Sequence, residues 1–348
     1  ARAQGPGASI QREAFCAPMS AVYTWAERIR RGEPIPAPLA ALLVSATPLT
    51  RLGMTWRLHR PRTRVEARVI SFGNITVGGT GKTPAVIERA QQEIEAGRRV
   101  AVLTRGYGSG RRREPLVVTP DTPTNGLAQR VGDEAALVAR RVPGVTLVKA
   151  AERVAGARAA IDRYGCDTLI LDDGFQHVML ERDENILVVD ATNPFGNGRL
   201  APRGILREPL QAMQRATALL LTRCDQVADA DDLAKQLALL ALKAPVRKTR
   251  HAPCGLWRVA DGEPVPLGFL AGRGVTGACS IGNPEAFFDT LVSLGADVTR
   301  RMAFRDHAAI PTASLPHSGC VVVTEKDAVR MDDVGENVLA LAIALEDV

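Results

Sequence analysis

The sequence has few aromatic residues, no closely spaced pair of cysteines and no apolar run long enough to cross a membrane. Three Trp, three Tyr and eight Phe among 348 residues offer few surfaces on which nucleic-acid bases can stack. The six cysteines are scattered without a C-x-x-C pair, which is typical of free thiols in a reducing compartment. These shortages argue against a nucleic-acid-binding protein, a disulfide framework and a zinc site.

Residues 1–15 lack the apolar core and the small-residue cleavage site of a secretory signal, so we expect a flexible leader there. The apolar content of 46% and the charged content of 24% are those of a globular protein. A chain of 348 residues is long enough for two domains of ordinary size. We therefore expect two folded domains after the leader.

The net charge of +6 comes from the N-terminal part of the chain. Residues 1–66 contain ten arginines and four acidic residues, whereas the remainder has equal numbers of basic and acidic residues. A basic segment of this kind suits a surface rich in phosphate, either anionic lipid or nucleic acid. Because the body of the protein is balanced in charge and poor in aromatics, the sequence favours an anionic membrane surface and no nucleic acid.

Residues 16–64 are expected to form a basic, amphipathic, membrane-associating segment. Within them the uncharged run at 34–50 has four prolines and is shorter than the ~20 residues of a spanning helix. A basic stretch that contains Trp56 follows it, and this combination suits a helix lying in a membrane interface. The alternative is a helix packed on its own domain with a solvated basic face. The residues alone leave both interpretations open.

From residue 65 onward, apolar strands alternate with helical patterns, which predicts a parallel sheet covered on both faces. The strands of this first domain (65–245) are expected at Val65–Phe72, Arg99–Thr104, Thr146–Lys149, Thr168–Leu171, Ile186–Asp190 and Leu219–Thr222. Its helices are expected at Pro84–Ala96, Glu134–Arg141 and Ala150–Tyr164. Residues 246–348 are expected to form hairpin-like connectors and a second, smaller α/β domain, with strands near Gly277–Ile281, Cys320–Thr324 and Val338–Ile343.

The stretch GNITVGGTGKTP at 73–84 joins a predicted strand to a predicted helix and resembles a phosphate-binding loop. Its glycines let backbone N–H groups converge on phosphate oxygens at a helix N-terminus. Lys82 is expected to reach the terminal phosphates and the Thr83 hydroxyl to bind Mg²⁺. Thr76 stands where the usual pattern has glycine, and the alternative is a glycine-rich turn without a ligand.

The stretch LILDDGFQH at 169–177 is an apolar strand that ends in two aspartates. Adjacent carboxylates at the end of a buried strand are costly unless a cation meets them, so Asp172 and Asp173 are candidate Mg²⁺ ligands. A helix cap is the alternative for this pair. His177 is equally compatible with a substrate contact and with a structural hydrogen bond.

The stretch VGDEA at 131–135 opens a predicted helix with two acidic residues. Asp133 can serve as a base for an acceptor hydroxyl and Glu134 as a carboxylate near Mg²⁺. A simple helix cap explains the same residues. Arginine-rich segments at 104–113 and 196–209 follow predicted strands, so we expect them at the ligand crevice of the sheet, although each arginine taken alone suits a solvated surface.

The motifs GNITVGGTGKTP, TRGYG, VGDEA, LDDGFQH, GNGRLAPRGILREP, SIGNPEAFF, FRDHA and VTEKDAVR together resemble the tetraacyldisaccharide 4′-kinase family, the lipid A 4′-kinases. They occur in family order between about residues 70 and 330 and are specific as a set. The threonine at the first loop position is similar to the family's own pattern. Residues 1–15 lie outside the resemblance.

The resemblance implies a P-loop NTPase-like parallel-sheet domain and a smaller α/β domain, joined by a two-stranded linker with the active site between them. It implies transfer of the γ-phosphate of ATP, with Mg²⁺, to the 4′-hydroxyl of an acylated glucosamine disaccharide 1-phosphate, which gives lipid IV-A. The implied location is the cytoplasmic face of the bacterial inner membrane. No feature of the sequence indicates an obligate protein partner.

The resemblance also implies roles for individual residues. The catalytic residues would be Asp133, His307 and Lys82. ATP would be bound by Thr76, Val77, Gly78, Gly79, Thr80, Gly81, Lys82 and Thr83. Mg²⁺ would be held by Thr83, Glu134, Asp172 and Asp173. The lipid substrate or the transferring phosphate would be contacted by Tyr107, Gly108, Arg153, His177, Arg207 and Glu208.

Two other classes of protein share parts of these motifs. Partition-type ATPase or GTPase switches on membrane surfaces also carry a G-G-x-G-K-T loop, but with a lysine where this chain has Val77. Such a switch hydrolyses nucleotide without a phosphorylated product. A nucleotide-binding scaffold without catalysis would keep its function when Lys82 is replaced by alanine.

Overall fold

The computed structural model describes residue 25 and residues 28–29, 33–106, 114–123, 126–306 and 308–348. The leader (1–15), the start of the basic segment and three expected site residues, Tyr107, Gly108 and His307, lie outside the described residues.

The described chain builds one continuous sheet of 13 strands, in the order β11-β10-β12-β13-β8-β7-β6-β1-β5-β2-β4-β3, with β9 paired to β8. The strands are β1 (Arg68–Gly73), β2 (Val100–Thr104), β3 (Leu116–Val118), β4 (Thr146–Lys149), β5 (Thr168–Leu171), β6 (Glu184–Asp190), β7 (Ala218–Thr222), β8 (Val246–Arg258), β9 (Pro264–Val265), β10 (Gly274–Cys279), β11 (Asp297–Ala303), β12 (Cys320–Thr324) and β13 (Val338–Asp347). The helices are α2 (Ala37–Leu58), α3 (Lys82–Glu95), α4 (Leu127–Val131), α5 (Asp133–Arg141), α6 (Arg153–Tyr164), α7 (Ala230–Leu240), α8 (Pro284–Ser293) and α9 (Glu325–Ala328). Short 3₁₀ turns are η1 (Leu210–Arg215), η2 (Cys224–Gln226), η3 (Leu267–Leu270) and η4 (Thr312–Ser314).

The expected α/β fold is confirmed, and each expected strand overlaps an observed one. Strands β1, β5, β2 and β4 pair in parallel, as do β6 and β7, because helices return the chain to the same edge. Successive residues of these strands face opposite layers: Ile70 packs under α3 to α5, whereas Val69 packs under α6. Burial on both faces explains why these strands read as continuous apolar runs.

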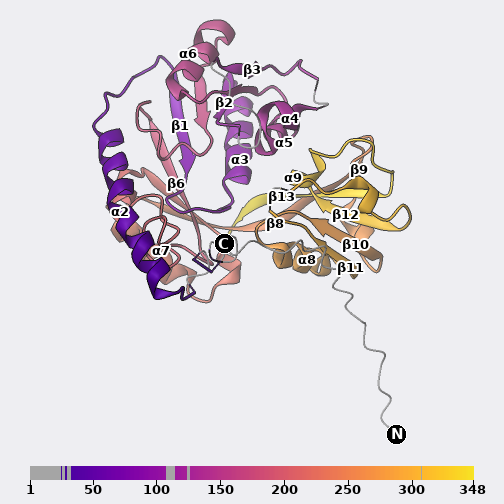
Figure 1. Cartoon of the computed structure of the whole chain (residues 1–348). Helices are drawn as coiled ribbons and strands as arrows, with labels where there is room; N and C mark the ends of the chain where they lie inside the picture. Colours follow the sequence, from indigo (N-terminus) through magenta and orange to yellow (C-terminus); the bar gives the residue numbers. More distant parts are fainter. Residues whose placement is uncertain (1–24, 26–27, 30–32, 107–113, 124–125, 307) are drawn as a thin grey trace.

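Two long strands connect the two parts of the sheet. β8 begins parallel to β7 at Val246 and then runs antiparallel to β13, which lies between β8 and β12. We call β1 to β7 with α3 to α7 the first lobe, and β9 to β12 with α8 and α9 the second lobe. Each lobe has hydrophobic clusters of its own, and Figure 1 shows them side by side with β8 and β13 between them.

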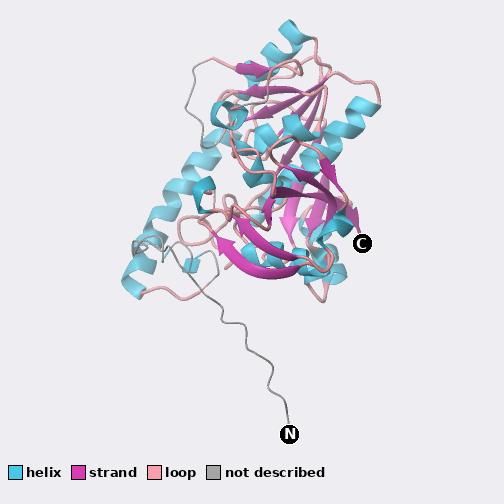
Figure 2. Ribbon diagram, turned by 90° about the vertical axis from the view of Figure 1, so that its right-hand side faces the viewer, coloured by secondary structure: helices cyan, strands magenta, loops and turns pink. Residues whose placement is uncertain are grey.

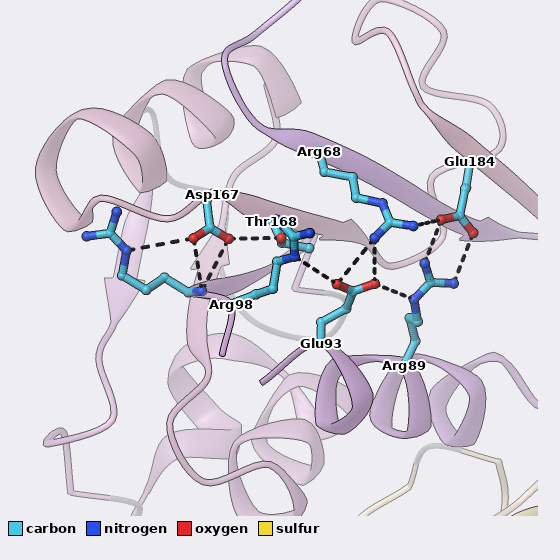
Figure 3. A network of polar contacts seen from close by, with 8 residues as sticks. Arg68, Arg89, Glu93, Arg98, Asp167, Thr168 and Glu184 are labelled. Carbon is cyan, nitrogen blue, oxygen red and sulfur yellow. Dashed lines mark hydrogen bonds and ion pairs between the residues drawn. The ribbon is translucent and has the colours of Figure 1, made fainter. Parts of the chain in front are cut away.

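An ion-pair network fixes the helix that follows the phosphate-binding loop. Arg89 of α3 contacts Glu93 at 2.8 Å and Glu184 of β6 at 2.5 Å, and Arg68 of β1 contacts Glu184 at 2.6 Å (Figure 3). Glu93 is only 6% exposed, so its partners are needed to compensate for its lost hydration. The network joins α3 to β1, the strand that precedes the loop, and to β6, which pairs with β1.

Helix α2 lies along the outer edge of the first lobe in both views (Figures 1 and 2). Met54 is buried in the cluster that covers β6 and β7, so one face of α2 is docked. Leu42, Leu52 and Trp56 are 67%, 68% and 61% exposed. Among the described helices, none is both long and apolar enough to span a bilayer. The helix therefore packs on its own domain and also presents large apolar side chains outward.

Candidate functional site

The glycine loop between β1 and α3 presents an open backbone. Gly78 and Gly79 are exposed, and nothing lies within 4 Å of the place where a Cβ would stand on either of them. Gly81 has a φ of 81°, and a Cβ there would come within 2.6 Å of His251 Nε2, so both conformation and space require glycine. No side chain caps α3 at Gly81. The first amides of α3 thus remain available to an anion.

Lys82, the first residue of α3, lies between two side chains that end neighbouring strands. Its Nζ donates to Asn74 Oδ1 at 3.2 Å and lies 3.3 Å from Asp173 Oδ1. The Asn74 amide also donates to Thr76 Oγ1 at 3.4 Å. Asn74 therefore fixes both the lysine and the residue that replaces the usual first glycine.

The arginine-rich segment at 196–209 lies against the loop, as expected. Thr76 forms an isolated bridge with Leu206, and the Val77 amide donates to the Ile205 carbonyl at 2.7 Å. Arg207 from this segment pairs with Asp173 at 2.8 Å. Loop, segment and strand end therefore meet at one place.

The two aspartates after β5 have opposite electrostatic environments. Burial alone would raise the pKa of Asp173, but Lys82 and Arg207 outweigh it, and its pKa lies below the ordinary value. Burial, together with the nearby charges of Glu134 and Asp173, raises the pKa of Asp172 to about 7. Asp173 also has a φ of 53°, which is strained for a residue other than glycine.

Asp172 has the buried, uncompensated environment of a candidate cation ligand. It is 5% exposed, and its Oδ1 has no hydrogen-bond partner among the described residues. A divalent ion beside it would compensate for the burial and for the repulsion from Glu134 and Asp173. No three His, Cys, Asp or Glu side chains of the described ranges are grouped closely enough to hold a metal by themselves. The buried, unpartnered oxygen of Asp172 fits Mg²⁺, which binds through one or two carboxylates and takes its other oxygens from phosphate and water.

Replacing Asp172 with asparagine is expected to raise the melting temperature by a few degrees at pH 8 without Mg²⁺ and nucleotide. The raised pKa of Asp172 means that folding of the wild type becomes less favourable as the pH rises from about 4, its unfolded value, to about 7. The gain should therefore shrink as the pH is lowered from 8 toward 5. Scanning calorimetry over this range measures it.

Asp173→Asn is the matched control for that experiment. Asp173 has a lowered pKa and is paired with Lys82 and Arg207, so its loss should decrease the melting temperature at pH 8. An Asp172→Asn variant no more stable than the wild type would show that the Asp172 charge is compensated within the protein.

The two acidic residues that open α5 face the second lobe. Asp133 is 8% exposed, and its Oδ2 lies 3.9 Å from Lys326 Nζ and 4.0 Å from Arg330 Nη1. Glu134 Oε1 lies 3.2 Å from the same Lys326 nitrogen. Glu134 also contributes to the raised pKa of Asp172, so these carboxylates and the end of β5 share one electrostatic environment.

The comparisons with known proteins assign the chain to a family. The family model for tetraacyldisaccharide-1-P 4′-kinase, LpxK, matches residues 33–346. The chain belongs to this kinase family. It is 44% identical over 283 residues to the tetraacyldisaccharide 4′-kinase of Anaeromyxobacter dehalogenans (strain 2CP-C), which covers 78% of this chain and 74% of the relative. The corresponding kinase of Geobacter sulfurreducens is 38% identical over 309 residues, 85% of this chain and 83% of the relative.

A solved structure of the same kinase family agrees with the fold. The crystal structure of LpxK from Aquifex aeolicus in complex with ATP has a TM-score of 0.73 and 29% identity, and it covers 89% of this chain and 95% of that one. The resemblance noted in the sequence is confirmed, and this membership favours a kinase over a partition-type switch.

The remaining substrate-site candidates of this kinase have different surroundings. Arg153 is 3% exposed at the start of α6 and donates to the Ala150 carbonyl. Burial, then the charges of Arg153 and Arg105, lowers the pKa of His177 to about 4, so its imidazole is neutral at pH 7. Glu208 pairs with Arg215 at 2.6 Å. The charge of Arg153 acts on Asp172 and that of Asp173 acts on His177, so both candidates lie near the aspartates. Glu208 is instead paired with an arginine of η1.

Sequence reasoning missed several residues of this site in the kinase. Asn74, Lys326 and Arg330 had no assigned role, yet each contacts or approaches an expected site residue. Asn74 directly follows β1, and the position of a polar side chain at that strand end was a usable signal. Thr222 of β7 donates to the Thr80 carbonyl at 3.0 Å, which supports the loop from its far side.

Proposed function

We propose that the chain transfers the γ-phosphate of ATP to the 4′-hydroxyl of tetraacyldisaccharide 1-phosphate, which gives lipid IV-A. The observation that carries the proposal is the meeting of an open glycine loop, a lysine and two strand-end aspartates in a chain of this kinase family. Phosphoryl transfer needs positioning and charge neutralisation more than covalent chemistry, and these residues supply both.

ATP would lie in the loop at residues 76–83. The open amides around Gly78 and Gly79 and the uncapped start of α3 suit the phosphate oxygens. Lys82 is already held toward the strand end by Asn74 and Asp173, so its ammonium would meet the terminal phosphates with little rearrangement. LpxK from Aquifex aeolicus, with ATP in its structure, supports ATP as the donor.

Thr83, Glu134, Asp172 and Asp173 would hold Mg²⁺. When bound, the ion would neutralise charge on the phosphates and orient them. The unsatisfied oxygen and raised pKa of Asp172 support this assignment. Arg207 already neutralises Asp173, so Asp172 is the carboxylate with most to gain from the ion.

Asp133 would accept the proton of the 4′-hydroxyl. Its burial and its position at the N-terminus of α5, facing the second lobe, suit a base that works between two lobes. His307 would assist it. Tyr107, Gly108, Arg153, His177, Arg207 and Glu208 would contact the lipid substrate or the moving phosphate. The neutral imidazole of His177 can donate a hydrogen bond to a sugar hydroxyl or accept one from it.

We assign residues 65–245 to the kinase domain and residues 246–348 to the linker and second domain. Because β8 and β13 connect the lobes, bending of these strands would open and close the site between Asp133 and α9. The same proposal places the protein on an anionic membrane surface, at the cytoplasmic face of the bacterial inner membrane, through residues 16–64.

Replacing Leu42 and Leu52 with glutamate is expected to weaken binding to vesicles of anionic phospholipid by at least ~10-fold. These exposed side chains would enter the interface, and each buried leucine contributes about 1.5–3 kcal/mol. Flotation with the vesicles measures the bound fraction. The matched control replaces Leu239 and Leu242, which are equally exposed at 70% and 69% on and after α7. Equal binding by both double variants would favour another membrane surface.

ADP formation with and without the disaccharide acceptor tests the proposed reaction. A kinase forms ADP in proportion to the acceptor present, because the phosphate has no other efficient destination. A switch of the partition-ATPase type forms ADP at the same rate in both conditions. Acceptor-independent hydrolysis would therefore overturn the proposal.

A further inference from the structure

The motif VTEKDAVR forms a rigid platform in the second lobe. Thr324 ends β12, and its hydroxyl accepts a hydrogen bond from the Asp327 amide at 3.1 Å. Asp327 is 1% exposed; it accepts from the Ser280 amide at 3.0 Å and pairs with Arg330 at 2.7 Å. These contacts fix the single turn of α9 against the end of β10. The direction in which Lys326 leaves α9 is thereby fixed as well.

Lys326 reaches from this platform to both acidic residues that open α5. Its Nζ lies 3.2 Å from Glu134 Oε1, within hydrogen-bond distance, and 3.9 Å from Asp133 Oδ2. The side chain is 22% exposed, so the charges are only partly screened by water. Arg330 approaches Asp133 from the same platform at 4.0 Å. The second lobe thus supplies the cations for two carboxylates of the first.

A different ion pair joins the lobes without touching these carboxylates. Arg141, at the C-terminal end of α5, donates to Glu325 at 2.8 Å, and the Glu325 side chain is only 5% exposed. This neighbouring pair is a second attachment between α5 and α9. Attachment of the lobes therefore does not depend on Lys326 alone.

We propose that Lys326 is a positioning residue for phosphoryl transfer, which orients Asp133 and Glu134 from the opposite lobe. The inference rests on the proposed function, because it assigns to Lys326 the side chains proposed as base and metal ligand. Asp133 and Glu134 are adjacent, and Glu134 also acts on the buried Asp172, so their charges repel one another. A fixed ammonium between the first two reduces this repulsion and holds each carboxylate in one direction.

The position of Lys326 predicts an effect on turnover and little effect on ATP affinity. Lys326 contacts carboxylates at the start of α5, whereas the phosphate-binding loop is contacted by Asn74, Thr222 and the segment at 196–209. A base or metal ligand that is not held in one orientation lowers the rate of the chemical step, because phosphoryl transfer depends on close alignment of the reacting groups. The two kinetic constants therefore separate positioning from nucleotide binding.

Steady-state kinetics of Lys326→Met and Lys326→Arg test the inference. We expect Lys326→Met to lower kcat by ~10- to 100-fold with the KM for ATP changed less than ~2-fold. Lys326→Arg should recover most of kcat, because a cation of similar reach is restored. Melting temperatures establish that both variants are folded. A Lys326→Met variant with kcat within ~2-fold of the wild type would overturn the inference, as would Lys326→Arg equal to Lys326→Met.

The double substitution Arg141→Gln and Glu325→Gln is the structural control. It removes both charges of the neighbouring inter-lobe pair together, so neither member of the pair is left without the other. We expect it to lower the melting temperature while kcat stays within ~3-fold of the wild type. A loss of kcat as large as that of Lys326→Met would show that lobe attachment alone explains the effect. Absence of acceptor phosphorylation by the wild type would instead refute the proposed function.

Discussion

Asp133→Asn is expected to lower kcat by at least ~100-fold while ATP still binds. Asparagine keeps the shape of the side chain but cannot take a proton from the acceptor hydroxyl. Asp133 belongs to α5 and not to the glycine loop that would hold the nucleotide, so affinity for ATP should change little. Steady-state turnover and equilibrium binding of ATP, measured on the same preparation, check the two parts of this result.

The control for Asp133 is Asp162→Asn on α6, because Asp162 is exposed. It should leave both turnover and melting temperature unchanged. Near-normal turnover by Asp133→Asn would remove Asp133 as the base, and the proton would then have to leave by another route.

Lys82→Ala is expected to lower kcat/KM by ~10³-fold, the largest effect among the substitutions considered. The Lys82 side chain is 12% exposed and its ammonium is already held by Asn74 and Asp173, so its charge would act on the phosphates with little screening. Removal also leaves Asp173 with Arg207 as its remaining ion-pair partner among the described residues. Kinetics at saturating acceptor measure the loss.

Lys235→Ala, which removes an exposed lysine of α7, is the control for the loss of positive charge and should have wild-type kinetics. The non-catalytic scaffold hypothesis makes the opposite prediction for Lys82. If Lys82→Ala retains the cellular function of the wild type, the chain acts by binding nucleotide and not by transferring phosphate.

The parts of the fold that the sequence predicted are those whose pattern is set by local burial. β4, β5 and β12 occur at the expected residues, because each is an apolar run between turns. The family resemblance implied a two-stranded linker, but the residues of β8 did not identify it as one of the two strands: its 13 residues mix arginines, a histidine and a proline, and it pairs first with β7 and then with β13. The two halves of β8 pair with different strands, so no single face of β8 is buried along its whole length. Its sequence therefore shows no simple alternation of apolar and polar residues.

The residues of the site differ in the same way: some belong to local motifs, and others meet only through contacts between distant parts of the sequence. Lys82 and the two aspartates that follow β5 belong to short motifs whose spacing predicts their place at the carboxyl ends of the strands. The contact between Lys326 and Glu134 joins residues 192 positions apart. Nothing in the stretch around Lys326 indicates which carboxylate it meets, because that depends on how the two lobes pack. Asn74 is an intermediate case. Its position directly after β1 indicates that it lies at the site, but the sequence does not indicate that it contacts Lys82.

Transfer of label from γ-labelled ATP to a dispersed tetraacyldisaccharide 1-phosphate tests the central claim most directly. The account predicts a labelled lipid with its new phosphate on the 4′-oxygen, formed by the wild type and at least ~100-fold more slowly by Asp133→Asn. Label that appears only as inorganic phosphate, with the lipid unlabelled, would contradict it.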